Sequence, residues 1–146
     1  MKKILYRLLL LLYSRFFSTD NLSNKFPVSV KAVILDNNRY LMVKNERSEW
    51  DFPGGKLEKE EALSSTLIRE IKEELNLDIL VNDFVYVENH IVNNLPVIIV
   101  LFKTSILNEK KIILSYEHIN YNFYDLNELK HIKKSEWVAN YLDLNY

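Results

Sequence analysis

From residue 27 onward, the apolar positions of the chain follow a period of two. Val28, Val30, Ala32 and Ile34 are apolar, and the turn-forming run Asp36-Asn37-Asn38 precedes a second apolar run at residues 39–44. Alternation on both sides of a short polar turn is typical of a β-hairpin. We therefore expect two paired strands in this part of the chain.

Residues 61–75 change to the period of an α-helix, with an apolar face that is expected to pack on the rest of the domain. That face consists of Leu67, Ile68, Ile71 and Leu75. Asn76 follows, at the position where helices often end on a left-handed residue, and asparagine tolerates that conformation. The sequence predicts one amphipathic helix that ends before Asn76.

After this helix, apolar β-rich runs alternate with polar breaks. The runs lie at residues 79–81, 84–87, 96–102, 112–114 and 122–124. Residues 127–142 return to a helical period. The expected packing face of that helix is Leu129, Ile132, Trp137 and Tyr141. The order of strands, helix, strands and helix predicts an α+β domain or a sandwich with a mixed sheet.

The first 17 residues are basic and strongly apolar, and the next eight are polar enough for a linker. No small-residue cleavage site follows, and the run is shorter than the roughly 20 apolar residues of a membrane span. The polar residues of the segment share one sector of a helical wheel: Lys3, Arg7, Ser14 and Ser18. We expect an extra helix that packs on the domain or on a partner subunit. Membrane-surface anchoring and a cryptic export signal are the alternatives.

The composition fits one globular domain with this N-terminal appendage. The chain has 146 residues, of which 48% are hydrophobic and 27% charged, and its formal net charge is −1. Such a chain can bury a core of its own, and its charge does not favour a nucleic-acid-coating role. It has no cysteine, which excludes disulfides and thiolate metal sites. We expect residues 1–26 to be the N-terminal helix and linker, residues 27–146 to be the domain, and the location to be cytoplasmic.

Candidate chemistry is concentrated on the helix at residues 61–75. Glu70, Glu73 and Glu74 have i, i+3 and i+4 spacing, so their carboxylates project to neighbouring positions. Like charges at this spacing destabilise a helix, and Glu74 falls at the shoulder of the apolar face. Arg69 can offset one charge. A bound cation can offset the others, and oxygen ligands suit Mg²⁺, Mn²⁺ or Ca²⁺.

A solvated acidic helix face is the alternative interpretation of these glutamates. Gly54 and Gly55 argue against it, because they lie just before the helix, where close backbone approach to a ligand is most useful. The stretch from Gly55 to Leu77 resembles the signature of the Nudix hydrolases, G-x5-E-x7-R-E-U-x-E-E-x-G-U, in which U is a bulky aliphatic residue. Asn76 is the single departure, in place of the final glycine, and the left-handed turn is expected to survive it.

The resemblance implies a Nudix-like α/β/α sandwich on a mixed β-sheet. It also implies Mg²⁺- or Mn²⁺-dependent hydrolysis of the pyrophosphate bond of a nucleoside diphosphate linked to another moiety, with water attacking one phosphorus. Arg69 and Glu61 resemble the pair that braces the catalytic loop against the helix. The residues that resemble the metal ligands are Glu70, Glu73, Glu74 and, through its carbonyl, Gly54.

The general base comes from different places in different members of the family. Glu70 is one candidate. Glu117 is the candidate for a further carboxylate from the loop before the last strand, and His118 is a candidate assistant from the same loop.

The sequence does not single out a substrate, and a nucleotide sugar such as ADP-ribose and a nucleoside triphosphate both stay open. The expected partner is a small-molecule nucleotide and not a nucleic acid. A homodimer stays open, and membrane association through the N-terminal helix is not favoured. The alternative function is a non-catalytic nucleotide-sensing or interaction module that keeps the Nudix fold, which the intact glutamates disfavour.

Overall fold

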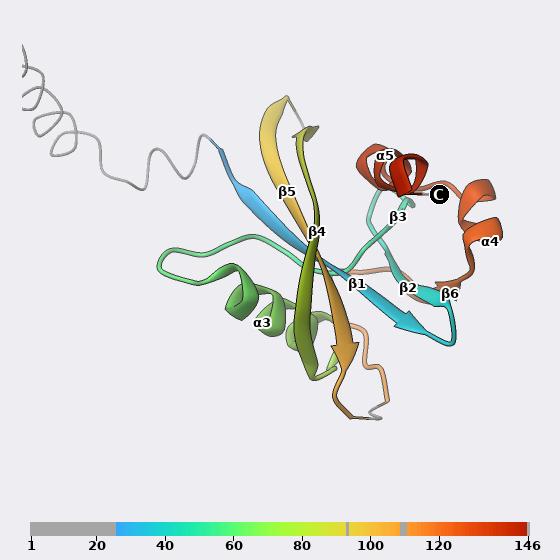
Figure 1. The fold of residues 1–146 in the computed structure, drawn as a ribbon, viewed down its shortest axis with the longest axis horizontal. Helices are drawn as coiled ribbons and strands as arrows, with labels where there is room; N and C mark the ends of the chain where they lie inside the picture. Colours follow the sequence, from blue (N-terminus) through green and yellow to red (C-terminus); the bar gives the residue numbers. More distant parts are fainter. Residues whose placement is uncertain (1–25, 93, 109–110, 146) are drawn as a thin grey trace, which may run out of the picture.

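The computed structural model describes residues 26–92, 94–108 and 111–145 of the chain. In this part of the chain, six strands form a mixed sheet with helices on both of its faces (Figure 1). The strands are β1 (Val28–Asp36), β2 (Arg39–Lys44), β3 (Trp50–Asp51), β4 (Ile79–Val92), β5 (Leu95–Ile106) and β6 (Asn120–Tyr124). The helices are α3 (Leu63–Leu75), α4 (Leu126–His131) and α5 (Glu136–Asn145). The predicted α+β fold with a mixed sheet is confirmed, whereas the predicted N-terminal helix lies outside the described residues.

The sheet has the strand order β3-β2-β1-β5-β4, and β6 pairs with β2. β1 runs parallel to β5, and β4 runs antiparallel to β5. β1 and β2 form the predicted hairpin. Asn37 and Asn38 have φ angles of 48° and 60°, the left-handed values that a tight two-residue hairpin turn requires.

The loop that contains both glycines lies along the edge of β1. β2 pairs with β1 only beside the turn, where Leu35 faces Tyr40. Farther from the turn, the amide of Val30 donates to the carbonyl of Gly55 at 2.8 Å, and the next inward-facing residue, Ala32, donates to Pro53 at 2.9 Å. These bonds satisfy backbone donors of β1 and hold the loop against the centre of the sheet.

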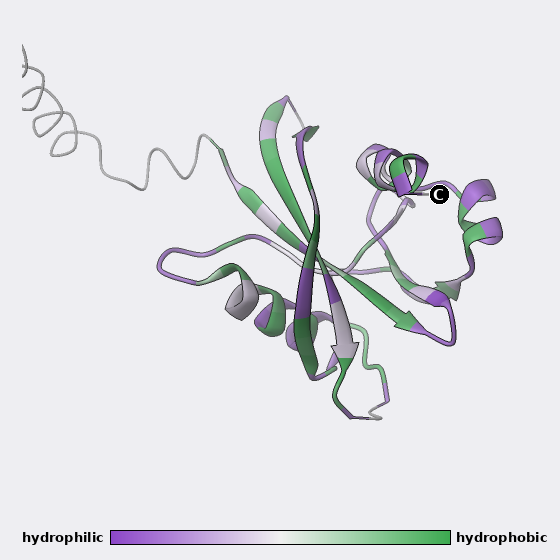
Figure 2. Cartoon of the chain, in the orientation of Figure 1, coloured by the Kyte–Doolittle hydropathy of each residue, from purple (hydrophilic) through white to green (hydrophobic). Residues whose placement is uncertain are grey.

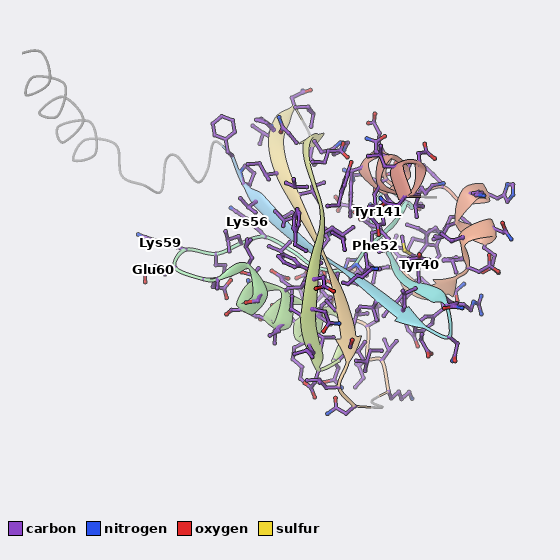
Figure 3. All side chains as sticks on the ribbon, viewed as in Figure 1. Tyr40, Phe52, Lys56, Lys59, Glu60 and Tyr141 are labelled. Atoms are coloured by element: carbon purple, nitrogen blue, oxygen red, sulfur yellow. The ribbon has the colours of Figure 1, made fainter. Side chains whose placement is uncertain are left out.

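Two hydrophobic clusters fill the space on the two faces of the sheet. Figure 2 shows hydrophobic residues concentrated along β1 and β5, the strands between the layers. α3 covers one face with Leu67, Ile71 and Leu75. α4 and α5 cover the other face, where Phe52 lies between Tyr40 and Tyr141 (Figure 3). This three-layer packing places the glycine loop and α3 beside the same strand.

Three details of the predicted helices and strands were wrong. Ile68 is 45% exposed, because the buried face of α3 is rotated toward Glu74 and away from Ile68. The run at residues 112–114 forms no strand. Its backbone instead binds the end of α3, where the amide of Ile113 donates to Leu75 O at 3.1 Å and satisfies a terminal helix carbonyl. The runs at residues 79–81 and 84–87 belong to the single strand β4, which has register shifts between them.

The predicted C-terminal helix is divided into α4 and α5. The residues between them pair with β3: the amide of Trp50 donates to Lys133 O at 2.9 Å, and the amide of Ser135 donates to Trp50 O at 3.1 Å. A backbone paired in this way cannot continue the helical ladder. The predicted packing residues Leu129, Trp137 and Tyr141 are buried, and Ile132 packs against them. Among the described residues, no helix has the length and hydrophobicity needed to cross a membrane.

The left-handed conformation at the end of α3 can be tested by substitution of Asn76. It adopts φ 58° and ψ 25°, and its amide donates to Lys72 O at 3.0 Å, as predicted for a left-handed C-terminal residue. Asn76→Ala should lower the free energy of unfolding by about 1 kcal/mol, because a β-carbon is disfavoured in this conformation. Asn76→Gly, which also removes the side chain, should change it by less than about 0.5 kcal/mol. Urea unfolding of the two variants checks the difference, and equal losses would contradict it.

Candidate active site

The carboxylate of Glu74 joins three separate parts of the chain. Its side chain is only 5% exposed, although it belongs to the acidic run of α3. Oε2 accepts a hydrogen bond from the amide of Gly54 at 2.8 Å, and Oε1 lies 2.7 Å from Nε2 of His118. Glu74 therefore fixes the glycine loop and the loop before β6 to the helix.

Burial opposes the charge of Glu74, and its neighbours restore it. Burial alone raises the pKa of this carboxyl group. The hydrogen bond from His118, the nearby ammonium of Lys31 and the amide of Gly54 outweigh that effect, so the pKa of Glu74 lies below its usual value. Glu74 is held as a carboxylate.

Lys31 is a member of this cluster that sequence reasoning missed. It projects from β1, and its Nζ donates to the carbonyl of Gly54 at 2.7 Å and lies 4.0 Å from Oδ2 of Asp51. A lysine among the apolar residues of a central strand is the signal that marks it. Both polar backbone groups of Gly54 are thus bound, one by a carboxylate and one by an ammonium group.

A β-carbon would clash with a neighbour at each of the two glycines, and the neighbour differs between them. Gly54 has φ +124°, and a β-carbon there would lie 2.3 Å from the carbonyl oxygen of Val30. A β-carbon at Gly55 would lie 2.4 Å from Cδ of Glu70. Gly54 therefore allows the loop to approach β1, and Gly55 leaves room for the carboxylate of Glu70.

Glu70 is packed between the glycine loop and Arg69. Burial raises the pKa of Glu70 above its usual value, and the hydrogen bond from Arg69, with Nη1 3.0 Å from Oε1, opposes that effect. A hollow of about 650 Å³ opens beside this carboxylate. Lys56 and Glu61 also line it, and Figure 3 shows Lys56 on the loop that leads to the outer tip at Lys59 and Glu60.

Arg69 is the centre of an ion-pair network that joins the segment before α3 to the helix itself. It donates to both oxygens of Glu61, from Nε at 2.8 Å and from Nη2 at 2.9 Å. Nη1 also lies 3.2 Å from Glu73, which is the predicted i, i+4 pair. The bonds from Arg69, together with one from Oγ1 of Thr66 at 2.8 Å, lower the pKa of Glu61 to about 2, and the carboxylates raise the pKa of Arg69. A bidentate pair of this kind fixes side-chain orientation as well as charge.

The structure separates the other predicted residues by their exposure. The side chain of Glu73 is 60% exposed, so it reaches the surface of the site from α3. Glu117 is also exposed, and the bond that it makes within its loop comes from its backbone amide, to Oγ of Ser115 at 3.4 Å. His118, and not Glu117, is the residue of that loop whose side chain reaches Glu74. A solvated face therefore describes Glu73 but not Glu70 or Glu74.

The donor atoms at this site have the chemistry of a hard divalent cation site. Carboxylate oxygens of α3 and the carbonyl of Gly54 lie on the two sides of one loop-helix contact, and oxygen ligands suit Mg²⁺ and Mn²⁺. In the present side-chain arrangement, Arg69 and Lys31 supply the positive charge, and no three acidic or histidine side chains of the described residues converge on one point. The residues fit such an ion by their chemistry.

Comparison with known proteins identifies the class to which the fold and this site belong. Residues 25–144 match the NUDIX domain family. The chain therefore belongs to the Nudix hydrolase family, a family of nucleotide pyrophosphohydrolases. None of the curated proteins compared with the chain matches it.

Solved structures of Nudix proteins share the fold. A MutT protein from Methanosarcina mazei Go1 has a TM-score of 0.74 at 24% sequence identity, over 82% of this chain and 91% of that one. An ADP-ribose pyrophosphatase from Streptococcus suis has a TM-score of 0.64 at 20% identity, over 81% of this chain and 90% of that one. An Ap4A hydrolase from C. elegans has a TM-score of 0.67 at 17% identity, over 81% and 92%. At these identities the likeness concerns the fold.

The low pKa of Glu61 predicts how acid affects stability. A carboxyl group with a folded-state pKa of about 2 and an ordinary value of 4.5 stabilises the fold fully above pH 4.5, and the contribution is lost as the pH falls toward 2. Glu61→Gln should therefore be less stable than the parent at pH 7, and the gap should close between pH 4.5 and pH 2. Urea unfolding across this range measures the gap. Glu58→Gln is the matched control, since Glu58 is exposed and lies 3.9 Å from Arg69. A gap at pH 2.5 as large as the gap at pH 7 would contradict the prediction.

The two glycines should differ in their tolerance of a β-carbon. Gly54→Ala meets backbone atoms of Val30 and Lys31 at a positive φ, so it should lower the free energy of unfolding by at least about 2 kcal/mol. The atoms nearest to a β-carbon in Gly55→Ala belong to the end of the Glu70 side chain, which can rotate away, so the loss should stay below about 1 kcal/mol. Urea unfolding at neutral pH compares the two, and a larger loss for Gly55→Ala would show that the loop is held differently.

Proposed function

We propose that this protein is a Mg²⁺- or Mn²⁺-dependent hydrolase that cleaves the pyrophosphate bond of a nucleoside diphosphate linked to another moiety. In this proposal the metal ligands come from one helix and one loop: Glu70, Glu73, Glu74 and the carbonyl of Gly54. Arg69 and Glu61 brace the loop against the helix, and Glu117 is the further carboxylate from the loop before β6.

The observation that carries the proposal is the contact of the glycine loop with two carboxylates of α3, the buried Glu74 and the partly buried Glu70. The amide of Gly54 is bound to Glu74, and Gly55 leaves room for Glu70. Glu74 has a structural role, because it holds the glycine loop, but the partly buried Glu70 beside it adds an electrostatic cost that this role does not require. The positive charge of a cation bound together with phosphates would offset this electrostatic cost.

The reaction adds water to one phosphorus while the bond from that phosphorus to the bridging oxygen breaks, and the bridging oxygen leaves with the second phosphate. A bound Mg²⁺ or Mn²⁺ supplies positive charge that polarises the water and neutralises phosphate oxygens. Glu70 lies at the wall of the hollow, where its carboxylate is a candidate to accept a proton from that water. Lys56 lines the same hollow, and its ammonium group favours a phosphate there. Arg69 holds Glu70 and Glu73 in place through its hydrogen bonds.

The substrate within this class stays open between a nucleotide sugar such as ADP-ribose and a nucleoside triphosphate. Two of the similar structures are named for different substrates, ADP-ribose and Ap4A, and their low identity to this chain does not favour one. The alternative function, a nucleotide-sensing module without turnover, would keep the same fold and hollow. A measurement of turnover distinguishes the hydrolase from the sensing module.

The purified protein should cleave one class of nucleotide in the presence of Mg²⁺ or Mn²⁺. A panel of nucleoside triphosphates, nucleotide sugars, dinucleotides and capped RNA, read by release of monophosphate, pyrophosphate and phosphate, identifies the class. Glu73→Gln should lower turnover by about two orders of magnitude or more, because it removes a charged ligand while its exposed position spares the core.

Glu46→Gln is the matched control, since Glu46 is an exposed glutamate in the loop between β2 and β3. It should keep the activity of the parent protein. Equal activity of Glu73→Gln and the parent would overturn the site assignment. Nucleotide binding without release of any product, in the parent protein and with both metals, would favour the sensing module.

A further inference from the structure

The outer part of β4 has its polarity reversed. Three large apolar side chains face solvent: Phe84 is 57% exposed, Val87 is 53% exposed and Ile91 is 59% exposed. Glu88 and His90, on the other face, are half-buried, and Asn89 is the exposed polar residue between Val87 and Ile91 on the apolar face. A strand with one solvated face normally places its apolar residues inward and its polar residues outward. The pattern on β4 therefore indicates that something covers the apolar face.

The exposed residues lie on the face of the sheet that α3 covers in part. Val87 pairs with Val100, which pairs with Val30 of the cluster under α3. The ring of Phe84 lies 6.0 Å from that of Phe102, which also packs against that cluster. α3 covers this face at the start of β4, where Ile79 is buried, and leaves the part from Phe84 to Ile91 open.

This open part, which we call the outer apolar patch, consists of Phe84, Val87, Ile91, Ile98 and Phe102. The chain enters β1 beside it. The carbonyl of Pro27 accepts a hydrogen bond from the amide of Ile98 at 2.9 Å, so β1 begins beside the end of the β4–β5 hairpin, as Figure 1 shows. The 25 residues that precede Phe26 therefore leave the domain at the border of the patch.

The length and the composition of residues 1–25 both match the outer apolar patch. A helix of the 17 apolar and basic residues at the N-terminus would be about 25 Å long. The strand from Phe84 to Ile91 extends over about 23 Å. The eight-residue linker can span up to about 28 Å, which is enough to turn the helix back onto the strand. The predicted helix has a narrow polar stripe with leucines on the rest of its surface, so it would itself need an apolar face to pack against.

We propose that residues 1–25 dock on the outer apolar patch of their own chain, with the predicted helix covering β4 beside α3. The docked segment completes the helical layer on this side of the sheet. It buries the apolar residues of the patch and those of the segment in the same contact. A second copy of the chain and a membrane surface are other occupants with the same apolar chemistry, and they give different results in the test.

The test uses the full chain and relies on its lack of cysteine. Ser14→Cys, on the polar stripe of the predicted helix, carries a nitroxide spin label, and the amide signals of the ¹⁵N-labelled protein are recorded with the label oxidised and reduced. Docking predicts strong broadening of the signals of Phe84, Val87 and Ile91. Those signals should be unaffected when spin-labelled chains without ¹⁵N are mixed with ¹⁵N-labelled chains that carry no spin label.

Broadening in the mixed sample as well would assign the contact to a second copy and overturn the proposal. Absence of broadening until vesicles of anionic lipid are added would assign the segment to a membrane and also overturn it. If no sample showed broadening, the proposal would also be overturned.

Two variants of the spin-labelled chain show whether the patch is the docking surface. Val87→Asp should abolish the broadening at Phe84 and Ile91 while the signals of α5 keep their positions. Leu80→Asp is the matched control. Leu80 is an exposed apolar residue of the same strand, but it points to the opposite face, because its neighbours Ile79 and Val81 face α3. It should leave the broadening unchanged, and loss in both variants would contradict docking on the patch.

Discussion

The hydrogen bond from the amide of Gly54 to the buried carboxylate of Glu74 is the contact on which the site depends. It joins a loop that lies along the edge of β1 to the last turn of α3, so the sheet and the helix meet at one backbone group. The loop is already fixed on its other side by the bond between Val30 and Gly55. Because both sides are fixed, the glycine backbone has one position relative to the carboxylates, and that rigidity is what a preorganised site requires.

A contact of this kind has to be balanced electrostatically, and the balance comes from separate elements of the fold. Three carboxylates on neighbouring positions of one helix repel one another. Arg69 neutralises part of this charge from the helix itself, Lys31 acts from β1, and His118 contributes a hydrogen bond to Glu74 from the loop before β6. That loop is held in turn by the end of α3, where the amide of Ser115 donates to Glu74 O at 2.9 Å. The fold therefore brings these partners together before any ligand binds.

Local periodicity predicted the parts of this arrangement that depend on neighbouring residues. The hairpin at Asn37 and Asn38, the left-handed Asn76 and the pair of Arg69 with Glu73 all follow from short spacings. The parts that depend on distant contacts were not predictable in this way. The break between α4 and α5 exists because the backbone there pairs with Trp50, far away in sequence, and the role of Lys31 follows from a loop 23 residues later. Spacing within one element carries no information about such contacts.

The same cations that balance the carboxylates would also compete with the metal ion of the proposed function. Lys31 is bound to the carbonyl of Gly54, and Arg69 is bound to Glu70 and Glu73, so oxygen atoms proposed as ligands already have positively charged partners. A divalent ion at these oxygen atoms would have to displace those partners, and its apparent affinity would be lowered by the free energy of releasing them. Arg69 can give up one bond and keep its pair with Glu61, whereas Lys31 would lose a short bond in a largely buried position. Lys31 would therefore influence metal binding more strongly than an exposed lysine would, because β1 holds it beside the carbonyl of Gly54.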